Sequence, residues 1–336
     1  MISTYIESVK DGQSLGVDEA EQCLNIILEQ EISDENIAEL LVVLSQKGEE
    51  ADEILGFCRA LLGKALEVSL PSEVLDLCGT GGSGLDRFNV STTAAFVLAA
   101  GGVPVVKHGN RGSKKPNGSF DLLEKLGCNF DLRDGRMREV FDETGLSFLF
   151  ARKFHPVMGK VVAARQMANR RTIFNLSAPL CNPVNPQYQM VGTIDVDMGR
   201  RLAQVLRELG RKRFLVVVGA PGIDEMSISG ETQVIEYDQG DFREYTLSPS
   251  GFGISALDYD TIPGGDYTEN QGIFLSLMED QTPGSILDMV CLNAGAAFYC
   301  FGKTETIQDG YLLSKDLFKN GLVREKFLEF KRVSNL

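Results

Sequence analysis

A glycine-rich segment at residues 79–84, reached from a short apolar run, constrains this chain more than any other stretch. Leu75 and Leu77 lie among the small apolar residues of an expected buried strand, and four glycines then fall within six residues. Glycine at this density lets the backbone turn sharply and approach a ligand, because no Cβ stands in the way. Ser91 and Thr92 then open an alanine-rich helical run, where hydroxyl residues suit the N-cap. A strand, a glycine turn and a helix N-terminus in this order present free N–H groups, which favours phosphate binding.

This loop differs from the two common phosphate loops. It lacks the Gly-Lys-Ser/Thr ending of the nucleotide-triphosphatase loop and the Gly-x-Gly-x-x-Gly order of dinucleotide binders. A tight turn without a ligand is the alternative interpretation of the segment alone. A second segment, 107–111, follows the apolar run 103–106 and contains a lysine, an arginine and one of the two histidines. Because ligands of open α/β sheets bind beyond the carboxyl ends of strands, the two segments together predict one binding site.

The composition limits the classes of partner. The chain has 336 residues, enough for one large or two unequal domains, and its 33 basic and 47 acidic residues give a net charge of −14. A chain this acidic repels nucleic acid and anionic membranes, so neither is expected as a partner. An anionic small substrate would therefore need a local basic patch, for which the candidates are Lys107, Arg111, Lys114, Lys115, Arg165, Arg170 and Arg171.

The seven cysteines have neither Cys-x-x-Cys spacing nor a His-rich partner segment, which is typical of free thiols in a reducing cytosol. Cys78, beside the glycine loop, is interpreted as a small strand residue rather than a nucleophile. We expect no signal peptide at the N-terminus and no apolar run of roughly 18 residues that would span a membrane. The prediction is a cytoplasmic protein.

The apolar periodicity predicts two parts. Residues 1–69 carry helical spacing and almost no strand signal, with amphipathic helices expected at 18–30, 34–47 and 51–66. From residue 70 to 336, short strands alternate with helices, which indicates a large α/β domain with a mostly parallel central sheet. Part of 167–190, which contains a proline-braced crossover at Asn182-Pro183, is expected to join the helical domain.

Within the α/β part, individual elements follow from short apolar runs. Strands are expected at 74–77, 103–106, 148–150 and 214–218, and a β-hairpin across 232–247. Helices are expected at 121–126, 159–167, 202–209, 286–301 and 309–320.

An acid pair, Asp224 and Glu225, follows the strongest expected strand, 214–218. Adjacent acids at the carboxyl end of a strand suit a magnesium ion held partly by protein and partly by a phosphorylated substrate. A solvated loop is the alternative for an isolated pair, but a phosphate loop at the same sheet edge favours the metal. Mg²⁺ there would offset the charge of a bound diphosphate and assist its departure.

Two further side chains are open to more than one interpretation. Arg165 lies in the otherwise apolar stretch 161–165. It is either a surface arginine or a guanidinium that binds a carboxylate through two hydrogen bonds. His155 is compatible with a packed core histidine. The chain has no Ser-His-Asp order and no metal-type His cluster, so no residue is assigned as acid, base or nucleophile.

Ordered motifs along nearly the whole chain resemble the anthranilate phosphoribosyltransferase family. They are Gly79-Thr80-Gly81-Gly82, Phe88-Asn89-Val90-Ser91-Thr92, Lys107-His108-Gly109-Asn110-Arg111, Gly118-Ser119-Phe120-Asp121, Phe154-His155-Pro156, Arg171-Thr172-Ile173-Phe174-Asn175, Asp224-Glu225, Gly264-Gly265-Asp266 and Leu292-Asn293-Ala294-Gly295-Ala296-Ala297. The resemblance implies a small helical domain, a larger α/β domain with the fold of the nucleoside phosphorylases, and a homodimer formed through the helical domain. The implied reaction joins anthranilate to phosphoribosyl diphosphate (PRPP), the second step of tryptophan synthesis.

The resemblance also implies roles for individual residues. Those that would bind PRPP are Gly79, Gly81, Gly82, Ser83, Asn89, Ser91, Thr92, Lys107 and Ser119. Anthranilate would be bound by Gly79, His108, Asn110 and Arg165. The Mg²⁺ ligands would be Ser91, Asp224 and Glu225.

Departures from the family pattern cluster around the implied diphosphate site. Ser83 stands where Asp is usual, Val218 where His is common, and Pro221 where Asp is common. Residues 112–117, with two lysines, replace a serine-rich stretch. These changes leave open a paralogue for another aromatic acid or base, and a non-catalytic member. A non-catalytic nucleic-acid binder would be basic and would lose the acid pair, whereas this chain is acidic and keeps it.

Overall fold

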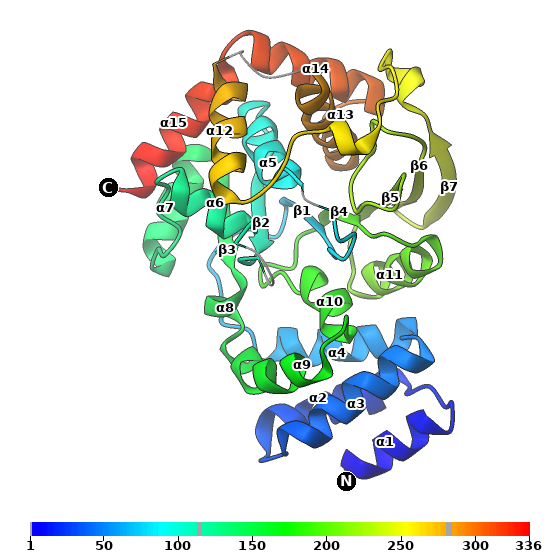
Figure 1. Ribbon diagram of the computed structural model, residues 1–336. Coiled ribbons are helices and arrows are strands. Elements are labelled where there is room, and N and C mark those ends of the chain that lie inside the picture. Colours follow the sequence, from blue (N-terminus) through cyan, green and yellow to red (C-terminus); the bar gives the residue numbers. More distant parts are fainter. Residues whose placement is uncertain (1, 86, 113–115, 280–283) are drawn as a thin grey trace.

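The structure is a computed structural model that describes residues 2–85, 87–112, 116–279 and 284–336, so Lys114 and Lys115 of the expected basic patch lie outside the described residues. A bundle of N-terminal helices stands at one end of the molecule, and a larger part built around a seven-stranded sheet forms the other (Figure 1). The prediction of a small helical domain followed by an α/β domain with a mostly parallel sheet is confirmed.

Four helices form the N-terminal bundle: α1 (Ile2–Lys10), α2 (Val17–Glu29), α3 (Asp34–Lys47) and α4 (Ala51–Gly63). The start of α3 is set by Ser33, whose Oγ accepts a hydrogen bond of 3.3 Å from the Asn36 N–H. Glu53 closes the start of α4 by accepting from the Glu50 N–H at 2.8 Å. The expected helices correspond to α2, α3 and α4, although α4 ends at Gly63 rather than at residue 66. The short α1 was not expected.

Two later helices pack onto this bundle. Helices α9 (Val162–Ala168) and α10 (Ile173–Ser177) contact α3 and α4, respectively (Figure 1). Phe174 of α10 meets Phe57 of α4 edge to face, with ring centroids 5.6 Å apart. Their apolar faces share one core with the N-terminal helices. The division at residue 69 stays a prediction.

The sheet runs in the order β3-β2-β1-β4-β5-β6-β7. Its strands are β1 (Leu75–Gly79), β2 (Val105–Gly109), β3 (Leu146–Phe150), β4 (Tyr188–Gly192), β5 (Arg213–Gly219), β6 (Thr232–Asp238) and β7 (Asp241–Leu247). The first five pair in parallel, and β6 and β7 form the expected antiparallel hairpin. Because β1 lies between β2 and β4, the strand order reverses beside it. Such a switch point is where open α/β sheets bind ligands.

Strand β4 is absent from the strands expected on sequence because Gln189 interrupts its apolar run. Gln189 is fully buried, and its amide donates to Asp76 Oδ2 at 3.2 Å and to the Pro179 carbonyl at 3.3 Å. A polar side chain satisfied in this way is tolerated in a central strand. The pattern of hydrophobicity therefore hides the strand that completes the switch point.

Both faces of the sheet are covered. Val216 and Phe214 of β5 face the N-terminal bundle and α11 (Val196–Glu208), whereas Leu215 and Val217 face the opposite core. That opposite layer contains α5 (Val90–Ala100), α6 (Ser119–Lys125), α7 (Asp134–Thr144), α12 (Tyr267–Met278), α13 (Gly284–Phe301), α14 (Ile307–Lys319) and α15 (Leu322–Ser334) (Figure 1). Of these, α7, α12 and α15 were not expected, although the buried apolar residues of α15 recur at helical spacing.

Helix α13 bears on the expectation that no apolar run would span a membrane. Among the described residues it is the one helix long and apolar enough to do so, with a mean hydropathy of 1.4. Two thirds of it is buried inside the protein, at 67%. It packs against α5, α14 and β4. These contacts make it a core helix.

The crossing of α2 and α4 depends on Gly56. A Cβ there would lie 2.4 Å from the Val17 carbonyl oxygen and 2.7 Å from the Glu21 nitrogen, both of them backbone atoms. We expect Gly56→Ala to lower the free energy of unfolding by about 1–3 kcal/mol. Gly63→Ala in the same helix is the control, since nothing lies within 4 Å of its Cβ. Urea unfolding should separate the two variants, and equal stability would show that the helices are not in close contact at Gly56.

Candidate active site

The glycine loop leaves β1 and turns back along the carboxyl edge of the sheet. The Thr80 N–H donates to the Gly192 carbonyl of β4 at 2.9 Å, which ties the loop to the neighbouring strand. Gly81 and Gly82 have φ angles of +65° and +98°, a region that side chains disfavour. At Gly79, a Cβ would stand 2.1 Å from Asp224 Oδ2. The loop is therefore glycine-rich because it must turn and must approach a carboxylate.

The acid pair lies directly after β5, across from this loop. Asp224 is only 6% exposed, so the alternative of a solvated loop is wrong for it. Its Oδ2 accepts from the Gly81 N–H at 2.7 Å, and its Oδ1 pairs with the guanidinium of Arg87. A tight turn in which Gly219 and Ile223 exchange backbone hydrogen bonds of 3.0 and 2.8 Å brings the pair back toward the sheet.

Asn293 of α13 braces the chain just after the acid pair. Its side chain accepts from the Met226 N–H at 2.8 Å and donates to the Met226 carbonyl at 3.0 Å. Both groups are buried. On sequence, Asn293 is only part of a motif that carries the family resemblance. Its role in positioning the acid pair becomes visible only in the fold.

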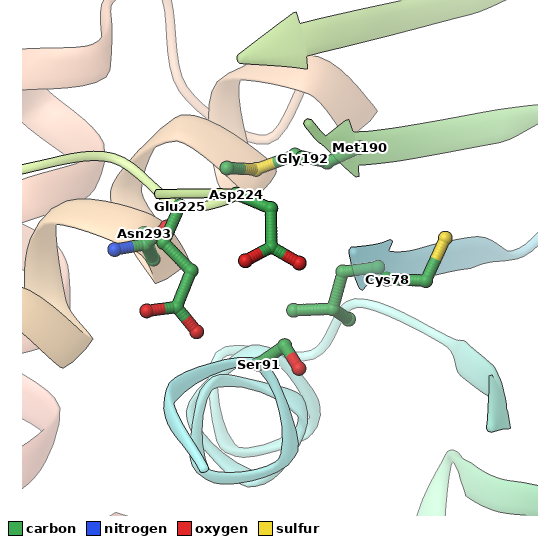
Figure 2. Close-up of a pocket in the computed structure, with 8 residues that line it drawn as sticks. Cys78, Ser91, Met190, Gly192, Asp224, Glu225 and Asn293 are labelled. Carbon is green, nitrogen blue, oxygen red and sulfur yellow. The ribbon is translucent and has the colours of Figure 1, made fainter. Parts of the chain in front are cut away.

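Asp224, Glu225 and Ser91 line a small cavity of about 20 Å³, large enough for one water-sized group. Figure 2 shows both carboxylates directed toward Ser91, which lies in the first turn of α5. Glu225 Oε2 is buried and has no hydrogen-bond partner among the described residues. Two carboxylates and a hydroxyl are the oxygen donors that Mg²⁺ prefers. The donor set and the unpartnered oxygen therefore fit a magnesium ion.

The two carboxyl groups of the acid pair differ in their electrostatic environment. Burial raises the pKa of Glu225 to about 8, and the nearby Asp224 charge adds to the effect, while Arg87 opposes it. Burial alone would lower the pKa of Arg87, but Asp224 and Glu225 outweigh it and the pKa is raised. Asp224 is thus compensated by a guanidinium, whereas Glu225 favours its protonated form near neutral pH.

The loop between Ser83 and α5 is held by asparagines. Asn89 is the N-cap of α5, and its side chain donates to the Asn117 carbonyl at 2.8 Å. Its oxygen accepts from Asn270 at 2.9 Å. Ser83 accepts from the Leu85 N–H at 3.3 Å. Thr92 is buried, and its hydroxyl has no partner in the part of the chain that the structure describes.

Lys107 and His108 lie inside the protein at the end of β2. The Lys107 ammonium donates to the Leu77 carbonyl at 2.6 Å, and the residue is buried. The ring of His108 lies 5.3 Å from that of His155. Burial lowers the pKa of His108 well below its ordinary value, and His155 adds to the effect, so the ring is neutral. His155 is a packed histidine whose Nε2 lies 2.7 Å from the Cys181 carbonyl oxygen.

The remaining predicted residues are spread around this centre. Arg165 is half-buried on α9, with its guanidinium 5.5 Å from the centre of the Phe174 ring. It has no ion pair or hydrogen bond among the described residues, and burial lowers its pKa. Asn110 is exposed after β2, and Ser119 is the first residue of α6.

The structure thus brings the glycine loop, Ser91 and the acid pair into direct proximity. No hydrogen bond or ion pair joins Arg165, Asn110 or Ser119 to that centre among the residues described.

Two arginines lie near the loop: Arg87, which has no predicted role, and Arg171, which is a candidate for the basic patch. Arg87 forms an ion pair with Asp224. The Nη1 atom of Arg171 lies 2.8 Å from the position of a Cβ on Gly82, so its guanidinium lies against the glycine loop. Nε and Nη2 of Arg171 are buried without a partner among the described residues. Arg87 precedes one noted motif and Arg171 begins another, and the positive charge of Arg87 in an acidic chain is the signal that could have identified it.

The pKa of Glu225 gives a prediction for stability. An unfolded glutamate loses its proton near pH 4.3, whereas the folded one keeps it to about pH 8. The folded state therefore loses stability as the pH rises through this window. In Glu225→Gln this loss is absent, so the variant should gain stability relative to the wild type between about pH 5 and about pH 9.

Urea unfolding in EDTA at both pH values measures this difference, with the exposed Glu139→Gln as control. A difference between Glu225→Gln and the wild type that does not change with pH would contradict the assignment.

Comparison with known proteins identifies the family to which the chain is similar. The glycosyl transferase family matches it twice, as the helical bundle domain over residues 3–65 and as the α/β domain over residues 71–323. The anthranilate phosphoribosyltransferase of Persephonella marina is 40% identical over 99% of both chains, and that of Methanosarcina acetivorans is 40% identical over 97% of this chain and 88% of its own.

Solved structures agree with this match. The anthranilate phosphoribosyltransferase of Thermus thermophilus superposes with a TM-score of 0.90 at 35% identity, covering 99% of both chains. The Saccharomyces cerevisiae enzyme, in complex with PRPP and Mg, superposes with a TM-score of 0.88 at 25% identity and covers 99% of this chain and 98% of its own. With matches of this extent along its whole length, the chain belongs to the anthranilate phosphoribosyltransferase family.

Proposed function

We propose that this enzyme transfers the phosphoribosyl group of PRPP to the amino nitrogen of anthranilate and releases diphosphate. The observation that carries this proposal is the pairing of the glycine loop with the acid pair at the switch point of the sheet, where the Gly81 N–H and Asp224 Oδ2 are 2.7 Å apart. A phosphate loop alone would fit many ligands. A phosphate loop with adjacent carboxylates fits a substrate that arrives as a diphosphate with a divalent cation.

The chemistry needs little acid–base help. The arylamine nitrogen is neutral at cellular pH, and it attacks the anomeric carbon of the ribose as the C–O bond to diphosphate breaks. Positive charge develops on the sugar and negative charge on the leaving oxygens. Catalysis then rests on placement and on electrostatic stabilisation, which agrees with a site in which no nucleophile or base is assigned.

Each group of residues has a distinct part in this proposal. The backbone N–H groups of the glycine loop and the start of α5 would hold the phosphates. Ser91, Asp224 and Glu225 would hold Mg²⁺, which offsets the charge of the diphosphate when bound. The remaining residues proposed for PRPP are Asn89, Thr92, Lys107 and Ser119. Lys107 donates to the Leu77 carbonyl, so a direct contact with phosphate would require it to leave this partner.

The acceptor would be recognised by its carboxylate and its ring. Arg165 is half-buried without an anionic partner among the described residues. Burial of an unpaired guanidinium costs free energy unless an anion pairs with it. The neutral ring of His108 would pack against the aromatic acceptor, and Gly79 and Asn110 are proposed beside it.

Three properties extend the proposal beyond the reaction. Mg²⁺ dependence is supported by the fit of the donor set and by the Mg-bound complex of the yeast relative. A homodimer through the helical domain follows from the resemblance to the family. A cytoplasmic location is supported by the absence of disulfides, because all seven cysteines are free in the described residues.

The reaction can be tested directly. In the presence of PRPP and Mg²⁺, the purified protein should consume anthranilate, which is followed by the loss of its fluorescence, and EDTA should stop the reaction. The absence of turnover above background, alongside a competent control enzyme, would refute the proposed activity. Turnover with a different aromatic acid, and none with anthranilate, would identify a paralogue.

Arg165→Ala tests the acceptor side. Loss of a charge-assisted hydrogen bond costs about 1.5–3 kcal/mol, so the KM for anthranilate should rise roughly ten- to hundredfold. The KM for PRPP should change little, because its phosphates are held by the glycine loop. Arg152→Ala, at an exposed arginine that follows β3 and has no proposed role, is the control. A rise in the KM for PRPP with no rise for anthranilate would assign Arg165 to the other substrate.

A further inference from the structure

Arg87 occupies an unusual position in this site. It lies in the loop between the glycines and α5, and its side chain is 21% exposed, whereas that of Asp224 is 5% exposed. Its guanidinium contacts Asp224 Oδ1, on the opposite side of the carboxylate from the Gly81 N–H. Both oxygens of Asp224 therefore already have donors from this chain.

The backbone of Arg87 is held in place, so the ion pair is more than a contact of a loose surface side chain. The Arg87 carbonyl accepts from the Asn270 amide at 2.9 Å. A Cβ on Gly264 would lie 2.8 Å from the Arg87 Cα, so the segment at Gly264 packs directly on the backbone of this residue. One segment distant in sequence, 264–270, thus fixes the point from which the guanidinium reaches the acid pair.

Asp224 is paired with a guanidinium and Glu225, among the described residues, is not, and this difference affects metal binding. A divalent cation attracted to Asp224 meets a carboxylate whose charge is already compensated by a guanidinium, and repulsion between two cations at close range is strong. Glu225 Oε2 has no partner in the described part of the chain, yet one carboxylate binds a divalent cation weakly by itself.

We propose that Arg87 is the resident counter-ion of Asp224 and that it keeps the affinity of the acid pair for a free divalent cation low. In this role it is a positioning residue: it contacts a metal ligand and sets the condition under which the metal enters. A diphosphate group is the natural partner for the displaced guanidinium, because arginine binds phosphate oxygens through two parallel hydrogen bonds. The inference rests on the proposed function only in taking the acid pair as the metal site.

Mn²⁺ binding to the substrate-free protein tests this inference without any measurement of activity. Free Mn²⁺ is followed by electron paramagnetic resonance during titration of the wild type, Arg87→Gln and Arg87→Lys. We expect Arg87→Gln to bind Mn²⁺ roughly tenfold more tightly than the wild type or better, because the competing charge is gone. Arg87→Lys keeps the charge and should stay within about threefold of the wild type.

Two further variants complete the experiment. Arg138→Gln removes an arginine that pairs with Asp142 on the surface of α7, and it should leave the Mn²⁺ affinity unchanged. The double variant Arg87→Gln, Asp224→Asn should lose the gain, which places the bound Mn²⁺ at the acid pair. Urea unfolding of each variant confirms that it is folded.

The inference is overturned if folded Arg87→Gln binds Mn²⁺ no more tightly than the wild type. It is also overturned if Arg87→Lys gains as much as Arg87→Gln, because the charge would then be irrelevant. Retention of the full gain in the double variant would place the Mn²⁺ elsewhere and overturn it too. These outcomes are independent of whether the protein turns over anthranilate, so they are distinguishable from a failure of the proposed function.

Discussion

The close approach of one carboxylate to one loop organises this protein. Asp224 comes within 2.7 Å of the Gly81 nitrogen, and this contact joins the ends of β1 and β5, two strands separated by β4. Each neighbouring feature serves the approach. Gly79 has no Cβ because the carboxylate occupies that space, and Gly192 has none because the Asp224 backbone passes there. The interaction is partly buried and charge-assisted, so it is stronger than a fully exposed contact of the same length.

The order of strands explains why this contact can form at all. Parallel strands end at the same edge of a sheet, and the reversal of order beside β1 opens a crevice there. The two cores on either side of the sheet keep that edge rigid, since Leu215 and Val217 are packed in one and Phe214 and Val216 in the other. A catalytic arrangement that relies on placement needs such a frame, because a loose site loses most of the benefit of proximity.

Much of this could be predicted from sequence, for physical reasons. The glycine loop and β5 have strong local patterns, and the hairpin of β6 and β7 has a turn at Gln239-Gly240 between alternating residues. Strand β4 could not be predicted, because Gln189 is polar and its partner Asp76 comes from a distant segment. The ion pair of Arg87 and Asp224 could not be predicted either, since the two residues are 137 positions apart and only the folded sheet brings them together. The same holds for Asn293, which braces the acid pair from α13.

The apolar character of α13 has a consequence for how the chain is made. The helix contacts α5 and β4, elements that leave the ribosome long before it does. Until residues 284–301 have emerged, one face of the sheet lacks the helix that covers it. The growing chain must therefore hold an exposed apolar surface late into synthesis, and then sequester a segment apolar enough to attract membrane or chaperones. Docking of α13 onto α5 and β4 would cover the sheet and bury the apolar helix at the same time. Because α13 has a large contact with α14, the two helices could dock as a pair.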